Sequence, residues 1–340
     1  NPKMALRIGV AQMFILETPN HAAVDTSVDA ASKKWRGLVN AIMRNISREE
    51  SKYKKIFNSS PKIPKWLMER WRGNWPEDYP NFIKSIQDIH PHIDIAVKKN
   101  IKHWQIKLNA EILPDNALRI NDPGLVSQKA GYNDGEWWVQ DYSSQIPIKV
   151  FSVKKDEEIL DLCAAPGGKT AQMLNLGARV LSIDKNKNRI KKFNENMKRL
   201  KFDANIIEAD ILDYSTKKKW NKILLDAPCS STGTIRKNPD ILYSHSEKSI
   251  NNLSKLQKNL IEKSWSMLNK NGFLMYCNCS LEPEEGEKII EEFLSNNKNA
   301  KIIKFKHEEY KYLNNSIKRR GWIRVLPNDK GKVKNTDGFF

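Results

Sequence analysis

Residues 158–170 read EILDLCAAPGGKT, an apolar strand that turns through small residues directly into a helix. Short apolar segments of the same kind recur after it, with helical stretches between them. The five strand candidates are Glu158–Leu162, Val180–Ile183, Asn205–Ile207, Lys222–Leu225 and Phe273–Tyr276. Strands that alternate with helices predict a mostly parallel, doubly wound α/β sheet, which binds its ligands at the carboxyl ends of the strands.

The loop at 163–169 would lie at that edge of the sheet. Its two glycines tolerate backbone angles that other residues avoid, and the helix start offers unpaired N–H groups to an anion. The spacing of a phosphate-binding loop is absent, so the expected anion is a carboxylate, such as the one in S-adenosyl-L-methionine. Asp184 and Asp210 follow the next two strands, where they could meet a ribose and an adenine. The alternative is a tight turn with ordinary strand-end aspartates.

Two further strands run into cysteine motifs, Asp226-Ala-Pro-Cys229 and Tyr276-Cys-Asn-Cys279-Ser. A thiolate that adds to carbon 6 of a cytosine turns carbon 5 into a nucleophile that can attack a methyl sulfonium. A second base would help to remove the carbon 5 proton, and an acid near ring nitrogen 3, a place suited to Asp226, would stabilise the developing charge. The spacing alone does not say which sulfur attacks.

Four cysteines are too few and too unevenly spaced for a disulfide framework, so we predict a reducing, cytoplasmic location. We interpret the side chains of Cys163 and Cys277 as packing groups, because buried cysteines are usually inert. Cys277 and Cys279 have no second Cys or His pair at zinc spacing, so no metal site is predicted.

The first part of the chain predicts a helical domain over residues 1–58, with its first helix or helices missing. Apolar positions between Trp35 and Ile46 recur at three- and four-residue steps, and Ser32 is a plausible N-cap for that helix. Upstream, two more helices are expected at Leu6–Leu16 and Ala22–Ala31.

A small α+β module is predicted over residues 62–145, between the helical domain and a catalytic domain over 146–340. Strand-like pieces at Ile93–Val97, Ala117–Ile120 and Glu136–Val139 surround a helix-like segment from Trp104 to Ile112. Tryptophans at 66, 71 and 75 stand among basic residues, which suits RNA binding, although most tryptophans are core or interface residues.

The formal net charge of +18 suits a polyanionic partner such as RNA or DNA. A Lys-rich surface that serves solubility would give the same excess. No apolar run approaches the length of a membrane span, so no membrane partner is predicted.

From residue 158 onward the motifs resemble the Sun-type family of RNA (cytosine-5)-methyltransferases. The matching segments are ILDLCAAPGGKT, LLDAPCSSTGTIRKNPD, YCNCSLEPEEGE and the closing RVLP and DGFF. The resemblance implies a Rossmann-like domain that binds S-adenosyl-L-methionine, with Cys279 as the nucleophile and Cys229 as the residue that releases the product. The cofactor contacts that it implies are Cys163, Ala164, Ala165, Pro166, Gly167, Gly168, Lys169, Asp184, Asp210 and Asp226.

The rest of the chain resembles a bacterial branch of that family that modifies 16S ribosomal RNA. RGLVNAIMRNI is similar to the helical domain of the antitermination factor NusB, and PKWLMERW is similar to the joining segment. Asn278 stands where the family usually has Thr, and Asn238 where it has His. We therefore expect a monomeric enzyme that acts on 16S rRNA or a small-subunit assembly intermediate. The alternatives are the same chemistry on tRNA or another rRNA position, and a non-catalytic assembly factor.

Overall fold

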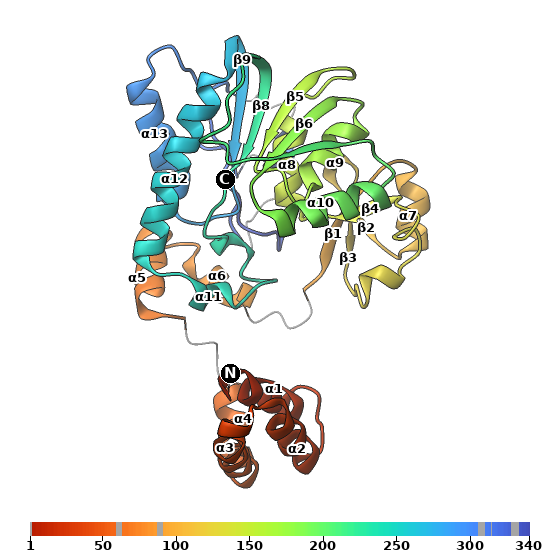
Figure 1. Cartoon of the computed structure of the whole chain (residues 1–340), viewed down its shortest axis with the longest axis vertical. Coiled ribbons are helices and arrows are strands. Elements are labelled where there is room, and N and C mark those ends of the chain that lie inside the picture. Colours follow the sequence, from red (N-terminus) through yellow and green to blue (C-terminus); the bar gives the residue numbers. More distant parts are fainter. Residues whose placement is uncertain (1, 59–62, 87–90, 305–309, 314, 328–332) are drawn as a thin grey trace. The chain divides into compact units, whose positions relative to one another are not determined.

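The computed structural model describes residues 2–58, 63–86, 91–304, 310–313, 315–327 and 333–340 (Figure 1). Contacts divide the chain into two units, residues 1–62 and residues 63–340, and each is described here by itself. The segment 59–62, between the predicted helical domain and the main part of the predicted α+β module, lies outside the described residues. None of the described helices is both long and apolar enough to cross a membrane.

The described part of the first unit consists of helices that pack on a small apolar core. Val39 and Met43 on one helix have no exposed surface, and a side chain at Gly9 would collide with Met43. The predicted helical region is confirmed, but the cap assigned to Ser32 is wrong, because its side chain makes no capping hydrogen bond and a 3₁₀ turn intervenes. The helices are α1 (Pro2–Phe14), α2 (Asn20–Ala30), α3 (Arg36–Arg48) and α4 (Glu50–Phe57).

The second unit begins with two helices and a small antiparallel sheet in the order β2-β3-β1-β4. Its elements are α5 (Lys65–Asn74), α6 (Tyr79–Ile86), β1 (Ile93–Val97), α7 (Ile101–Lys107), β2 (Glu111–Leu113), β3 (Ala117–Ile120) and β4 (Trp137–Val139). The helix predicted from Trp104 to Ile112 ends earlier in the structure, at Lys107. Asn109 takes a left-handed backbone conformation (φ 48°), which reverses the chain after α7 and starts β2.

The larger sheet is parallel throughout, in the order β7-β6-β5-β8-β9, and confirms the predicted doubly wound fold. Its strands are β5 (Glu158–Leu162), β6 (Arg179–Asp184), β7 (Asn205–Glu208), β8 (Trp220–Asp226) and β9 (Leu268–Cys277). The helices are α8 (Tyr142–Val150), α9 (Gly168–Asn175), α10 (Lys187–Arg199), α11 (Ile241–Ser244), α12 (Glu247–Ser266) and α13 (Glu287–Asn296).

Alternating strand residues bury themselves on opposite faces of this sheet. Ile159 and Leu224 pack in one core cluster with α8, whereas Leu160 and Leu225 pack in another with α12 and α13. Figure 1 shows α12 and α13 together on one side and α9 and α10 on the other. The strand order reverses between β5 and β8, and a crevice at such a point is where open α/β sheets bind ligands.

Candidate active site

The two motif cysteines lie against each other at the carboxyl ends of β8 and β9. These strands are adjacent and pair Asp226 with Cys277, so the loops that carry Cys229 and Cys279 leave the sheet side by side. The two sulfur atoms are 3.5 Å apart. The hydroxyl of Ser231 lies 3.4 Å from the Cys279 sulfur and 3.9 Å from the Cys229 sulfur. Both sulfurs are therefore close enough to contact the same bound chemical group.

The environment makes the two sulfurs chemically different. A hydrogen bond from the Cys229 thiol lowers the pKa of Cys279, with further help from Ser231, against the opposing effect of burial. The same hydrogen bond, burial and the Cys279 charge raise the pKa of Cys229 well above its ordinary value. These surroundings therefore favour ionisation of Cys279 over ionisation of Cys229.

Asp226 accepts hydrogen bonds from a buried lysine and from a third cysteine. Lys169 Nζ donates to Asp226 Oδ2 at 2.8 Å, and the Cys277 thiol donates to Asp226 Oδ1 at 3.6 Å. Burial lowers the pKa of Lys169, but the Asp226 carboxylate more than offsets this and raises it. Burial also raises the pKa of Cys277, so this third sulfur remains a thiol. The ammonium of Lys169 also lies 5.0 Å from the ring centre of Phe339.

Asp184 holds the cofactor loop in place. Its carboxylate accepts hydrogen bonds from the backbone N–H of Ala165 at 3.1 Å and of Asn186 at 3.0 Å, and Arg189 lies 3.5 Å away. The side chain is only 3% exposed, whereas that of Arg189 is 41% exposed. Each carboxylate oxygen still has a second lone pair, so a ligand could share Asp184 if Arg189, which also donates to the carbonyl of Ala165, moved aside.

The loop itself has the shape that the two glycines predict. Gly167 has a φ of 101°, and a side chain there would lie 2.6 Å from the Met197 methyl group. Cys163 also has a positive φ, and burial raises the pKa of its thiol, so its sulfur is not a nucleophile. The helix α9 starts at Gly168 and directs its first N–H groups toward the strand ends.

Asp210 follows β7, two residues after Glu208, which pairs with Asp184. Its carboxylate accepts from the backbone N–H of Leu212 at 3.0 Å and from Lys185 at 3.1 Å, and the Leu212 bond lowers its pKa. About a third of the side chain is exposed (33%), so it remains available to a ligand.

Sequence reasoning missed Asp161, which lies at the end of β5 directly before the cofactor loop. It is 1% exposed, Thr170 donates to its Oδ2, and Oδ1 has no hydrogen-bond partner among the described residues. Burial raises the pKa of Asp161 to about 7. An acidic residue inside an otherwise apolar strand was the available signal, because such a group is costly to bury without a partner.

The loop after Cys279 is held from outside by α5, a contact that sequence reasoning also missed. Trp71 Nε1 donates to Glu282 Oε1 at 2.9 Å, and Trp75 Nε1 donates to the carbonyl of Leu281 at 2.9 Å. Arg70 forms ion pairs with Glu282 and with the neighbouring Glu284. Trp71 has no exposed surface, so it is a packing residue, the alternative left open by the sequence.

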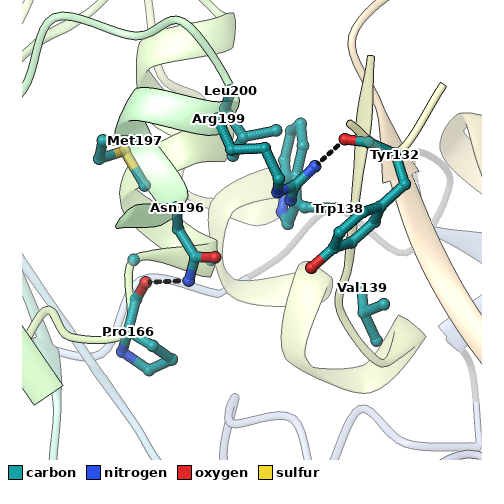
Figure 2. Close-up of a pocket in the computed structure, with 10 residues that line it drawn as sticks. Tyr132, Trp138, Val139, Pro166, Asn196, Met197, Arg199 and Leu200 are labelled. Carbon is teal, nitrogen blue, oxygen red and sulfur yellow. Dashed lines mark hydrogen bonds between the residues drawn. The ribbon is translucent and has the colours of Figure 1, made fainter. Parts of the chain in front are cut away.

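A pocket of about 190 Å³ lies on the flank of the cofactor loop (Figure 2). Figure 2 shows Arg199, which donates to the carbonyl of Tyr132, and Asn196, which donates to the carbonyl of Pro166. The pocket is lined by Tyr132, Trp138, Val139, Pro166, Gly167, Gly168, Asn196, Met197, Arg199 and Leu200. Neither motif cysteine lines it, so it is separate from the reacting centre.

Comparison with known proteins agrees with this geometry. The family model described as 16S rRNA methyltransferase RsmB/F matches residues 148–340, and the NusB family model matches residues 2–48. The protein PH0851, solved by crystallography, is 26% identical, with a TM-score of 0.83 over 100% of this chain and 81% of its own.

Two curated relatives are both named ribosomal RNA small subunit methyltransferase B. The one from Pasteurella multocida is 35% identical over 327 residues, which are 87% of this chain and 72% of the relative. The one from Cronobacter sakazakii is 32% identical over 321 residues, which are 87% and 74% of the two chains. The chain therefore belongs to the 16S rRNA methyltransferase RsmB/F family, and it is an rRNA methyltransferase whose methyl donor is S-adenosyl-L-methionine.

Proposed function

We propose that the enzyme methylates carbon 5 of a cytosine in 16S rRNA through a covalent bond between Cys279 and carbon 6. The observation that carries the proposal is the pair of sulfurs 3.5 Å apart, beside an aspartate that is held by a buried lysine. Addition of a thiolate is the established way to make carbon 5 of a pyrimidine nucleophilic, and a second sulfur at this distance can serve the later proton transfer.

The reaction begins with the thiolate of Cys279, which forms a bond to carbon 6 while the ring electrons move to nitrogen 3. Nitrogen 3 takes up a proton that passes from Lys169 through the Asp226 carboxylate, and returns it when the ring is restored. When bound, S-adenosyl-L-methionine supplies the methyl group as an electrophilic sulfonium. Cys229, once its own thiol proton has passed to water, removes the carbon 5 proton as a thiolate. The electrons of the carbon–hydrogen bond form the 5,6 double bond again, and Cys279 leaves as a thiolate.

The electrostatics of the pair fit this order of steps. Two of the causes that raise the pKa of Cys229 are the hydrogen bond to Cys279 and the charge on Cys279. Both disappear once Cys279 has become a thioether. Cys229 is thus kept protonated before the attack and becomes easier to ionise after it, at the stage where a base is needed.

The cofactor residues divide into contacts for each part of the ligand. The N–H groups at the start of α9 bind the methionine carboxylate, and the unpaired oxygen of Asp161 accepts from the methionine ammonium. Asp184 accepts from the ribose hydroxyls, with Arg189 displaced, and Asp210 meets the adenine. Asp161 fits this role because a buried carboxylate oxygen without a partner is otherwise unfavourable.

The RNA is bound by the NusB-like helices of residues 1–58 and by the module of residues 62–145, and the large positive charge of the chain attracts it. A monomeric state and a cytoplasmic location stay predictions. Bisulfite mapping of rRNA from cells with and without the protein tests the function. One cytosine of 16S rRNA should lose its protection when the protein is absent. Loss of protection only in tRNA or in another rRNA would contradict the substrate, and no change in any cytosine would contradict the reaction.

A further inference from the structure

Glu285 is a fully buried carboxylate that neither the family motifs nor the reaction steps above assign to a function. It lies in a 3₁₀ turn (Pro283–Glu285) between the Cys279 loop and α13, with no exposed surface. A buried charge is costly unless its hydrogen bonds are satisfied. The burial of this carboxylate therefore points to a function for its hydrogen bonds or its charge.

The carboxylate binds both cysteine loops at once. Oε1 accepts from the backbone N–H of Ser230 at 2.9 Å and from Gln257 Nε2 at 3.0 Å. Oε2 accepts from the hydroxyl of Ser280 at 2.5 Å and also from the hydroxyl of Ser230. Ser230 directly follows Cys229, and Ser280 directly follows Cys279. One side chain thus fixes the distance between the two loops.

The backbone of the same residue holds the end of β9. The carbonyl of Glu285 accepts from the Tyr276 hydroxyl at 2.7 Å and from Asn278 Nδ2 at 2.6 Å. Asn278 in turn accepts from the backbone N–H of Ser280 at 3.0 Å. Asn278, which replaces the usual Thr of the family, is therefore part of the same hydrogen-bond network as Glu285.

The four donors to the carboxylate are a backbone amide, a side-chain amide and two hydroxyls, all of them neutral. None of these donors carries a charge. After the hydrogen bond to Cys279, burial and the Cys279 charge, the Glu285 carboxylate is a further cause that raises the pKa of Cys229, and the backbone of Ser231 lowers it. The Ser231 and Tyr276 hydroxyls also face Cys229. Cys279 faces two opposite charges, since Asp226 raises its pKa and Lys169 lowers it.

We propose that Glu285 is a positioning residue for the methyl transfer, which ties the two cysteine loops together and directs negative charge to Cys279 by opposing it on Cys229. The carboxylate accepts from the backbone N–H of the residue that follows Cys229, and its charge is one of the causes that raise the pKa of that sulfur. This inference rests on the proposed function for its consequence, but its test needs neither RNA nor cofactor.

The two contributions of Glu285 can be separated by Glu285→Gln. The amide has nearly the same shape, and its NH₂ group can donate to the two serine hydroxyls, which can rotate to accept. The tie between the loops is then kept while the charge is lost. A purely structural role would leave the relative reactivity of the two sulfurs unchanged.

The experiment is alkylation of the full chain with iodoacetamide between pH 6 and pH 10, with the label at each cysteine measured by mass spectrometry. In the wild type we expect Cys279 to react first. In Glu285→Gln the ratio of Cys279 to Cys229 labelling should fall about tenfold, the effect of one pKa unit. The matched control is Glu282→Gln, another buried glutamate of the same turn, which is bonded to Arg70 and Trp71 and should leave the ratio unchanged.

An unchanged ratio in Glu285→Gln, or an equal fall in Glu282→Gln, would overturn the proposal. If Glu285→Gln does not fold, Ser280→Ala replaces it. This variant removes the hydrogen bond of the Ser280 hydroxyl to Glu285, together with its contacts to Ser230, Thr232 and the N–H of Glu282, and keeps the charge. The proposal then requires the wild-type labelling ratio together with a lower kcat, and a lost preference in Ser280→Ala would contradict it. If the labelling ratio behaves as expected while rRNA methylation does not depend on the protein, the proposed function fails and the charge effect stands.

Discussion

The two ends of the crevice differ in how far the protein satisfies its own polar groups. At the cysteine end, Glu285, Asn278 and Ser280 are buried and fully engaged with one another. At the cofactor end, the side chains of Asp226 and Asp210 are 30% and 33% exposed, and Asp161 keeps an oxygen without a partner among the described residues. The two sulfurs, which react in the proposed mechanism, are thus placed in advance, whereas the other end keeps hydrogen-bond acceptors that a ligand can use.

The largest expected effect is at Asp226, which binds Lys169 and Cys277. Asp226→Asn removes the charge that Lys169 binds and the group that relays its proton to nitrogen 3, so kcat should fall about 10²–10³-fold. Single-turnover methyl transfer to the rRNA substrate measures this. Asp213→Asn changes an exposed aspartate as the control. A rate within threefold of the wild type would remove Asp226 from the chemistry.

The next effect tests the binding end. Asp184→Ala should weaken the affinity for S-adenosyl-L-methionine about 10- to 100-fold, because hydrogen bonds to a charged group are lost. Calorimetry measures the affinity, and Asp203→Ala, on the exposed turn before β7, is the matched control. Thermal unfolding of both variants separates a lost contact from a distorted loop, since Asp184 also binds the N–H of Ala165. Equal affinities in the two variants would place the ribose elsewhere.

The pH dependence of cofactor binding sharpens the role of Asp161. Burial raises its pKa from 3.8 to about 7, so the carboxyl is neutral at lower pH and loses its attraction for the methionine ammonium. Cofactor affinity should therefore fall as the pH falls from 7.5 to 5.5, by up to about tenfold per unit. Asp161→Asn should be weak and independent of pH over the same range. A wild-type affinity that is flat with pH would contradict the assignment.

The smallest effect concerns the rigidity of the cysteine end. Arg70→Met leaves Glu282 buried without its cation, which should cost about 2 kcal/mol and roughly 4–8 °C of melting temperature. We also expect a few-fold loss of kcat, because the loop after Cys279 loosens. The control is Arg72→Met, an exposed neighbour on the same helix. If both variants melt alike, α5 does not support the loop.

Features that depend on residues close together in the sequence could be predicted, whereas contacts between distant residues could not. The strands of the large sheet and the motifs at their ends are local features, and the structure confirms the fold that they predict. The loop after Cys279 is held by the ion pair between Arg70 and Glu282, which lie 212 positions apart in the sequence. No local sequence pattern predicts such a pair. The helix after Trp104 was predicted to extend too far, because the apolar pattern continues past Asn109, whose left-handed backbone conformation reverses the chain. Asp161 and Glu285 looked like ordinary motif residues until their burial was known.

The central claim is that Cys279 attacks and Cys229 releases, and two variants test it on one denaturing gel. With S-adenosyl-L-methionine and rRNA present, Cys229→Ala should accumulate a protein–RNA complex that survives denaturation, because addition proceeds and elimination does not. Cys279→Ala should form no complex and transfer no methyl group. A complex in Cys279→Ala and none in Cys229→Ala would reverse the two roles. Methylation by both variants without any complex would contradict the covalent mechanism.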